Sequence, residues 1–113
     1  MIALLMGLKT ISPRELHRVM QELSVTVIDV NSTQSWNKAR VPGALNLDPV
    51  AWNEDDLPAD KDSRLVFYCS NPMCRKAPVA ARRATRLGYR DVKVLSAGIS
   101  GWLGAGLPTE GGA

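Results

Sequence analysis

Two hydrophobic patterns alternate along this chain and together predict helices packed on a sheet. Apolar residues recur at helical spacing across 13–23, which predicts an amphipathic helix. Runs rich in β-branched or aromatic residues occupy 25–30 and 65–68, and such runs are typical of strands buried on both faces of a parallel sheet. The alternation favours an α/β domain over a helical bundle or a sandwich of sheets.

Capping and turn residues predict where further elements begin and end. The stretch Ser-Pro-Arg-Glu at 12–15 has the form of a capping box, with proline in the first helical turn. Pro78 is compatible with a helix only near its start and Gly88 suits its end, so we predict a helix over 75–87. The other predicted elements are strands at 44–47 and 92–95, a helix at 99–104, and a loop over 48–63 with one short helix around Val50–Trp52.

The two ends of the chain are interpreted separately from the domain, which we expect to span 9–109. Residues 1–8 are apolar, but they lack the features of a signal peptide and are too few to cross a membrane. We interpret them as an N-terminal apolar segment or a first strand, and residues 110–113 as a flexible tail. A cytoplasmic protein with no membrane contact is therefore expected.

The charge of the chain changes this interpretation little. The 113 residues fit one domain, and the formal net charge is +3. Several cations follow Cys69 and predict a solvated helix face: Arg75, Lys76, Arg82, Arg83, Arg86 and Arg90. No aromatic residues interleave with basic ones as in nucleic-acid sites, so no nucleic-acid partner is expected.

Candidate chemistry lies where the strand 65–68 gives way to a helix. Cys69 directly follows this strand, at the sheet edge where the carboxyl ends of parallel strands meet and sites commonly form. Backbone N–H groups at a helix start, together with Arg75 and Lys76, would lower the pKa of a thiol there and make it a nucleophile. The competing interpretation is that Cys69 is a small buried hydrophobic residue.

A second cysteine, Cys74, lies five residues further on. It can pack beneath the loop, or it can act as a resolving thiol that forms a disulfide with Cys69. No metal is expected, because two cysteines and His17 are too few ligands for a closed zinc site. No histidine is near in sequence to serve as a base, which favours chemistry on a preformed thiolate.

Four stretches in order resemble one family. They are VIDVNSTQSW at 27–36, ARVPGALNL at 39–47, LVFYCSN at 65–71 and LGYRDVKVLSAGISGWLGAGLP at 87–108. Through them the chain resembles the rhodanese-like family of single-domain sulfurtransferases over nearly its whole length. The resemblance implies a three-layer α/β fold, with a central, mostly parallel sheet flanked by helices.

The resemblance also implies an activity that needs no cofactor. Cys69 would accept a sulfane sulfur from thiosulfate or a persulfide donor and pass it to a thiol or cyanide, assisted by Arg75. The expected partners are small sulfur donors and thiol acceptors, including a protein that carries a persulfide. Residues expected to contact substrate are Ser70, Asn71, Met73, Cys74 and Lys76.

The chain departs from the family pattern at several positions. Asn31, Arg40 and Ala97 stand where arginine, histidine and glycine are common. Five residues separate Cys69 from Arg75, and this Cys-x5-Arg spacing is that of rhodanese-fold phosphatases and arsenate reductases. Pro72 lacks the N–H that an oxyanion cradle would use, which argues against that alternative. An oxyanion enzyme and a non-catalytic binding module both remain alternatives to the sulfurtransferase.

Overall fold

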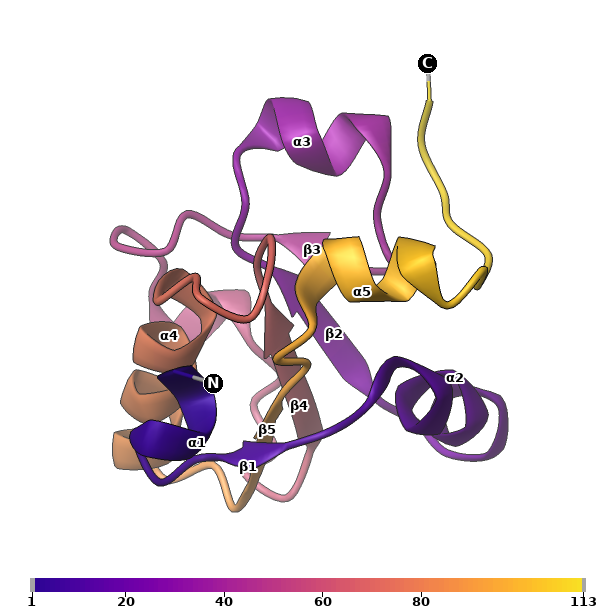
Figure 1. Cartoon of the computed structure of the whole chain (residues 1–113). Helices are drawn as coiled ribbons and strands as arrows, with labels where there is room; N and C mark the ends of the chain where they lie inside the picture. The colour runs from indigo at the N-terminus through magenta and orange to yellow at the C-terminus, as the bar shows by residue number, and fades with distance from the viewer. Residues whose placement is uncertain (1, 113) are drawn as a thin grey trace.

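A five-stranded parallel sheet is the centre of the computed structural model, which describes residues 2–112 (Figure 1). The strand order is β1-β5-β4-β2-β3, and every pairing is parallel. The strands are β1 (Lys9–Thr10), β2 (Thr26–Asp29), β3 (Leu45–Asn46), β4 (Arg64–Tyr68) and β5 (Asp91–Val94). This sheet confirms the predicted α/β class, and its central strand β4 leads directly to Cys69.

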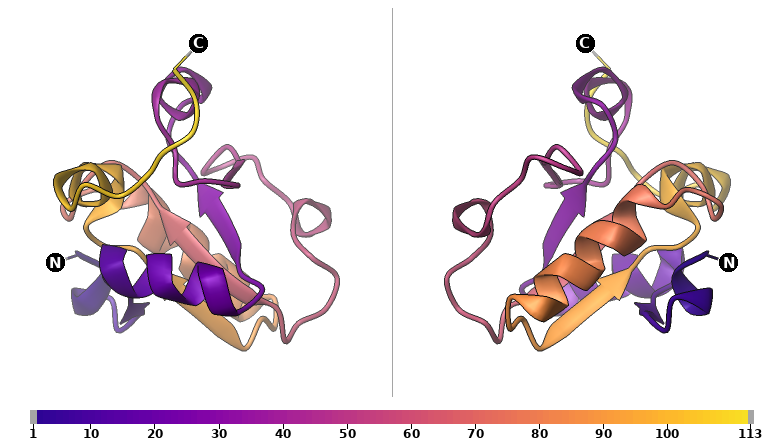
Figure 2. Two further views of the ribbon diagram at one scale, coloured as in Figure 1. Left: turned by 90° about the vertical axis from the view of Figure 1, so that its right-hand side faces the viewer. Right: turned by 90° about the vertical axis from the view of Figure 1, so that its left-hand side faces the viewer.

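Helices cover both faces of the sheet and produce the predicted three layers. Helices α1 and α4 lie on one face, and α2 and α5 lie on the other (Figure 2). The helices are α1 (Ile2–Leu5), α2 (Pro13–Glu22), α3 (Thr33–Lys38), α4 (Lys76–Arg86), α5 (Gly98–Gly104) and the 3-10 helix η1 (Glu54–Asp56). None of the helices within residues 2–112 combines the length and apolar character that crossing a bilayer requires.

The strands are buried on both faces because their side chains alternate between two apolar clusters. In β4, Leu65 and Phe67 belong to the cluster beneath α4, whereas Val66 and Tyr68 belong to the cluster beneath α2 and α5. Trp102 of α5 is fully buried in the second cluster. Both faces of β4 therefore need apolar residues, which explains the continuous hydrophobic run in the sequence.

The cap residues act largely as predicted. The Ser12 side chain accepts a hydrogen bond from the Glu15 N–H at 3.2 Å, and Pro13 is the first residue of α2. The Glu15 carboxylate pairs with Arg18 and does not complete the capping box. Gly88 follows α4 with a φ of 103°, a backbone conformation that glycine adopts without strain.

Two short segments differ from their predictions. Residues 2–5 form a helical turn that buries Ala3, and the edge strand is formed later, by Lys9–Thr10. The alternative interpretation of the N-terminal segment as a first strand is therefore wrong. The short helix expected around Val50–Trp52 is absent from the described structure. The Asp48 carboxylate accepts the N–H groups of Val50 and Ala51 and forms a turn, and the helical turn comes later, at η1.

The predicted flexible tail at 110–113 has partners that its composition does not indicate. Glu110 and Arg40 exchange backbone hydrogen bonds of 3.0 Å, and the Gly43 N–H donates to the Glu110 carboxylate. The Gly112 N–H donates to the Asn37 carbonyl at 2.8 Å. Met1 and Ala113 lie outside the described residues.

Candidate active site

Cys69 lies at the carboxyl end of the central strand and is held there by α5. Its carbonyl accepts the Ile99 N–H, and the Ser70 carbonyl accepts the Ser100 N–H, both at 3.0 Å. This close approach requires glycine at 98, since an added Cβ would lie 2.5 Å from the Ser70 carbonyl atoms. Gly98 also has a φ of +68°. The first turn of α5 thus fixes the backbone on which Cys69 stands.

The Cys69 sulfur faces the beginning of α4. Its Sγ accepts the Ala77 N–H at 3.4 Å, and the residue as a whole is only 3% exposed. The sequence predicts several loop amides around this sulfur, but within residues 2–112 the Ala77 N–H is the one backbone donor that reaches it. An N–H at a helix start stabilises negative charge, so this contact suits a thiolate.

Cys69 and Cys74 form a disulfide, with their Cα atoms 6.4 Å apart. Cys74 is partly buried and packs against the same apolar cluster as Cys69. The site is therefore in an oxidised form, in which Cys69 is both bonded and covered. The two thiols that the sequence marks as candidates do meet.

Asn71 shapes the loop between the two cysteines. Its carbonyl accepts the Cys74 N–H at 3.1 Å, and its side-chain Oδ1 accepts the Met73 N–H at 2.9 Å. Pro72 has no N–H to offer. These amides are engaged within the turn, so this form of the loop offers a poor cradle for a tetrahedral oxyanion.

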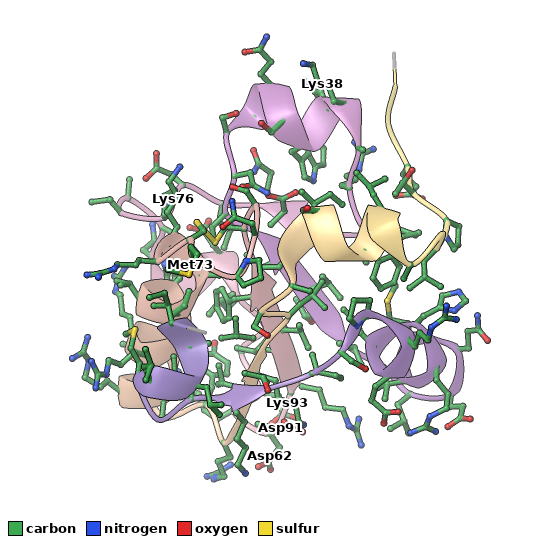
Figure 3. All side chains as sticks on the ribbon, viewed as in Figure 1. Lys38, Asp62, Met73, Lys76, Asp91 and Lys93 are labelled. Carbon is green, nitrogen blue, oxygen red and sulfur yellow. A yellow bond between two sulfur atoms is a disulfide. The ribbon has the colours of Figure 1, made fainter. Side chains whose placement is uncertain are left out.

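The predicted cations lie at the surface beside this loop. Arg75 precedes α4 and is exposed; no hydrogen bond or ion pair of its guanidinium occurs in the part of the chain that the structure describes. The predicted contact of Arg75 with the Cys69 sulfur is thus not made in the disulfide form. Figure 3 labels Met73 of this loop and Lys76, the first residue of α4.

Two recesses flank the start of α4, and Lys76 lines both. One, of about 270 Å³, is otherwise lined by Arg75, Pro49, Val50 and Val79. The other, of about 280 Å³, is more polar, and its lining includes Asn31, Ser32, Thr33, Asn46 and Asp48. Hydrogen bonds from Ala51 and Val50, with the Lys76 charge, lower the pKa of Asp48. Cys69 lines neither recess.

A buried polar network lies beneath the loop. Asp29 is fully buried; its carboxylate accepts the Tyr68 hydroxyl and the Asn31 N–H, both at 2.7 Å. The Val41 N–H donates to the Tyr68 hydroxyl oxygen, and the Ser70 hydroxyl donates to the Asn31 side chain at 3.3 Å. Burial raises the pKa of Asp29, and burial together with the Asp29 charge raises the pKa of Tyr68.

Sequence reasoning missed two contributors to this site, Ala77 and Gly98. Both act through the backbone, one by an N–H and the other by the absence of a Cβ. Gly98 lies within a stretch that carried the resemblance, which was the available signal for it. Among the described residues, no group of three or more histidine, cysteine, aspartate or glutamate side chains is placed to hold a metal ion.

The chain matches one family model and curated relatives of different lengths. Residues 12–105 match the model of the rhodanese-like domain. The thiosulfate sulfurtransferase GlpE of Actinobacillus succinogenes is 27% identical over 105 residues, which cover 93% of each chain. An HTH-type transcriptional regulator of Mycobacterium tuberculosis is 38% identical over 106 residues, but this chain spans only 45% of its length.

Solved structures agree with the fold. The BH2092 protein of Bacillus halodurans superposes with a TM-score of 0.81 at 24% identity, over 91% of this chain and 77% of that one. Thiosulfate sulfurtransferase from Pseudomonas aeruginosa gives a TM-score of 0.81 at 28% identity, over 93% of this chain and 20% of that one. With a family model that matches most of its length, the chain belongs to the rhodanese-like domain family.

Proposed function

We propose that this domain is a sulfurtransferase that carries a sulfane sulfur as a persulfide on Cys69. One observation carries the proposal: Cys69 ends the central strand with its Sγ against the Ala77 N–H, at the start of α4. That placement favours a thiolate and, after loading, a persulfide anion. Similarity to thiosulfate sulfurtransferases at 27% identity supports the same chemistry.

The donor step begins from the reduced site. The Cys69 thiolate attacks the sulfane sulfur of thiosulfate, the sulfur–sulfur bond of the donor breaks, and sulfite leaves with the electron pair. The product is Cys69–S–S⁻. Arg75 and Lys76 are exposed beside the loop and attract the dianionic donor. An acceptor thiolate or cyanide then attacks the outer sulfur, and Cys69 leaves as a thiolate. Neither step needs a cofactor.

Transfer requires that the Cys69–Cys74 disulfide is first reduced. In the disulfide form Cys69 has no free thiolate and is only 3% exposed, so donors cannot reach it. A reducing compartment such as the cytoplasm supplies this condition. The oxidised protein is therefore inactive until a reductant opens the site.

The surface around the loop also suits a protein that carries a persulfide. Val50, Met73 and Val79 are 86%, 69% and 50% exposed. Val50 and Val79 line the same recess as Arg75 and Lys76. Exposed apolar side chains mixed with cations fit a partner with apolar and acidic residues around its persulfide. Such a partner joins thiosulfate as a candidate sulfur donor.

The test is a transfer assay on the pre-reduced protein. With thiosulfate and cyanide, wild type should release sulfite and form thiocyanate, whereas Cys69→Ala should form neither. If wild type releases no sulfite but hydrolyses an aryl phosphate or reduces arsenate through Cys69, the oxyanion alternative replaces the proposal. If it does none of these, a non-catalytic binding module is the better account.

A further inference from the structure

Cys74 is a thiol that the proposed transfer does not use, yet it is placed within bonding reach of the nucleophile. The two Cα atoms lie 6.4 Å apart, inside the usual range for disulfides, and the two sulfurs are bonded. No backbone rearrangement is needed to bring them together. Any reaction at Cys69 thus takes place beside a second cysteine, Cys74.

The loop backbone holds Cys74 in that position. Asn71 accepts the N–H of Cys74 with its carbonyl and the N–H of Met73 with its side chain. These two hydrogen bonds close the turn between the cysteines. Cys74 also packs partly buried against the apolar cluster that contains Cys69. Its side chain is therefore directed at Cys69 by the turn and by packing.

Proximity separates the attack of Cys74 from that of external thiols. The turn places the two Cα atoms 6.4 Å apart, whereas an external thiol must first diffuse to the site. Cys74 reaches the inner sulfur of a Cys69 persulfide from within the loop. An intramolecular thiol held in this way has a high effective concentration, which external acceptors lack.

We propose that Cys74 resolves the Cys69 persulfide, so that the domain also releases hydrogen sulfide; this inference rests on the proposed function. The Cys74 sulfur attacks Cys69 Sγ, the bond from Sγ to the outer sulfur breaks, and the outer sulfur leaves as HS⁻. The balance is Cys69–S–S⁻ plus Cys74–SH giving the Cys69–Cys74 disulfide plus HS⁻. The two cysteines are oxidised by two electrons, and the sulfane sulfur is reduced.

The disulfide described above is the product of this step. An external dithiol reductant must reduce it before the next turnover, and becomes a disulfide itself. The reaction class is thus the dithiol-dependent reduction of a sulfane sulfur to sulfide. Transfer to an external acceptor and internal resolution compete for the same persulfide, and a nearby acceptor protein would favour transfer.

The experiment is a single turnover without added thiol or cyanide. Wild type and Cys74→Ser are reduced, freed of reductant under anaerobic conditions and mixed with one equivalent of thiosulfate. Sulfite, sulfide and the intact protein mass are then measured. Wild type should release sulfite and sulfide in equal amounts and end as the disulfide with no added sulfur. Cys74→Ser should release sulfite, keep the added sulfur, and give at least about tenfold less sulfide.

Several outcomes distinguish a failure of this inference from a failure of the proposed sulfur transfer on which it rests. If wild type releases sulfite but keeps its sulfur and yields no sulfide, the resolution step is wrong and the transfer function stands. If the added sulfur is found on Cys74, that residue relays sulfur and the proposed sulfide release is overturned. If neither protein releases sulfite, the proposed function fails and the inference falls with it. Cys69→Ser should give neither product, and wild type without thiosulfate should stay reduced.

Discussion

The floor of the site and the loop above it differ in how firmly they are held. The floor consists of Asp29, Asn31 and Tyr68, which are buried and joined by hydrogen bonds. The loop, residues 70–75, is mostly exposed and is closed mainly by Asn71 and by the disulfide. Cys69 lies between the two: it directly follows Tyr68 of the floor, its carbonyl accepts the Ile99 N–H of α5, and its sulfur is bonded to Cys74 of the loop.

This difference assigns separate tasks to the two regions. The floor and the first turn of α5 together set the position of Cys69, and rigid groups with satisfied hydrogen bonds serve that purpose. The loop determines what reaches the sulfur, because it carries Cys74 and precedes Arg75. Substitutions in the floor should therefore change stability most, and substitutions in the loop should change chemistry most.

The largest effect is expected at Gly98, where α5 meets the backbone of Ser70 at the start of the loop. Gly98→Ala puts a Cβ 2.5 Å from the Ser70 carbonyl atoms, on a backbone with a φ of +68°. We expect a loss of about 2–4 kcal/mol in the free energy of unfolding, measured by urea denaturation, and a loss of transfer activity. Gly104→Ala is the matched control in the same helix, because no atom lies within 4 Å of its added Cβ. Equal stability of the two variants would contradict the tight contact.

The next effect is expected in the floor itself. Tyr68→Phe removes a hydroxyl that donates to Asp29 and accepts from the Val41 N–H. Unfolding free energy should fall by about 1–3 kcal/mol, because two buried polar groups lose a partner. Tyr89→Phe is the control, because it removes a hydroxyl that is hydrogen-bonded to a single carbonyl. It should lower the unfolding free energy by less in the same urea titration. The reverse order would show that the floor is not the firmly held region.

A loop substitution should give the opposite profile. Arg75→Ala should leave the urea midpoint unchanged, since no ion pair or hydrogen bond of that side chain occurs within residues 2–112. The KM for thiosulfate should rise about three- to tenfold, as the dianion loses a nearby cation. Arg82→Ala, on an exposed position further along α4, is the control and should leave KM unchanged. If Arg75→Ala lowered the urea midpoint, the proposed difference between floor and loop would be contradicted.

The smallest effect concerns pH. Burial raises the pKa of Asp29 above that of the unfolded chain, so the folded state favours the protonated carboxyl. The stabilisation is full below the unfolded value of about 3.9 and is lost as pH rises through the folded pKa. Wild type should thus gain stability relative to Asp29→Asn as pH falls from neutral toward 4. Urea titrations across that range measure the difference. If the unfolding free energy of wild type fell relative to that of Asp29→Asn as the pH decreased, the raised pKa of Asp29 would be contradicted.

The sequence predicts the parts of this molecule whose pattern is long or chemically distinctive. The runs at 13–23 and 65–68 identify α2 and β4, because burial on one or both faces constrains every position. Residues 2–5 and 50–52 were misassigned, since in such short segments one buried side chain or one hydrogen-bonding aspartate decides the structure.

The same distinction holds within the site. Cys69 and Cys74 were found because a thiol is recognisable by residue type. The contributions of Ala77 and Gly98 depend on where α4 begins relative to the sulfur and how closely α5 approaches Ser70. These are properties of tertiary packing, and no local pattern encodes them. The absence of a contact between Arg75 and the Cys69 sulfur was missed for the same reason.

The central claim is that Cys69 Sγ is the atom that accepts the transferred sulfur. Its most direct test is to treat reduced Cys74→Ser with thiosulfate labelled with a heavy isotope in the sulfane sulfur only, and to map the label by tandem mass spectrometry. We predict that the label is attached to Cys69 and that the released sulfite is unlabelled. Label in the sulfite, or none on Cys69, would contradict the account.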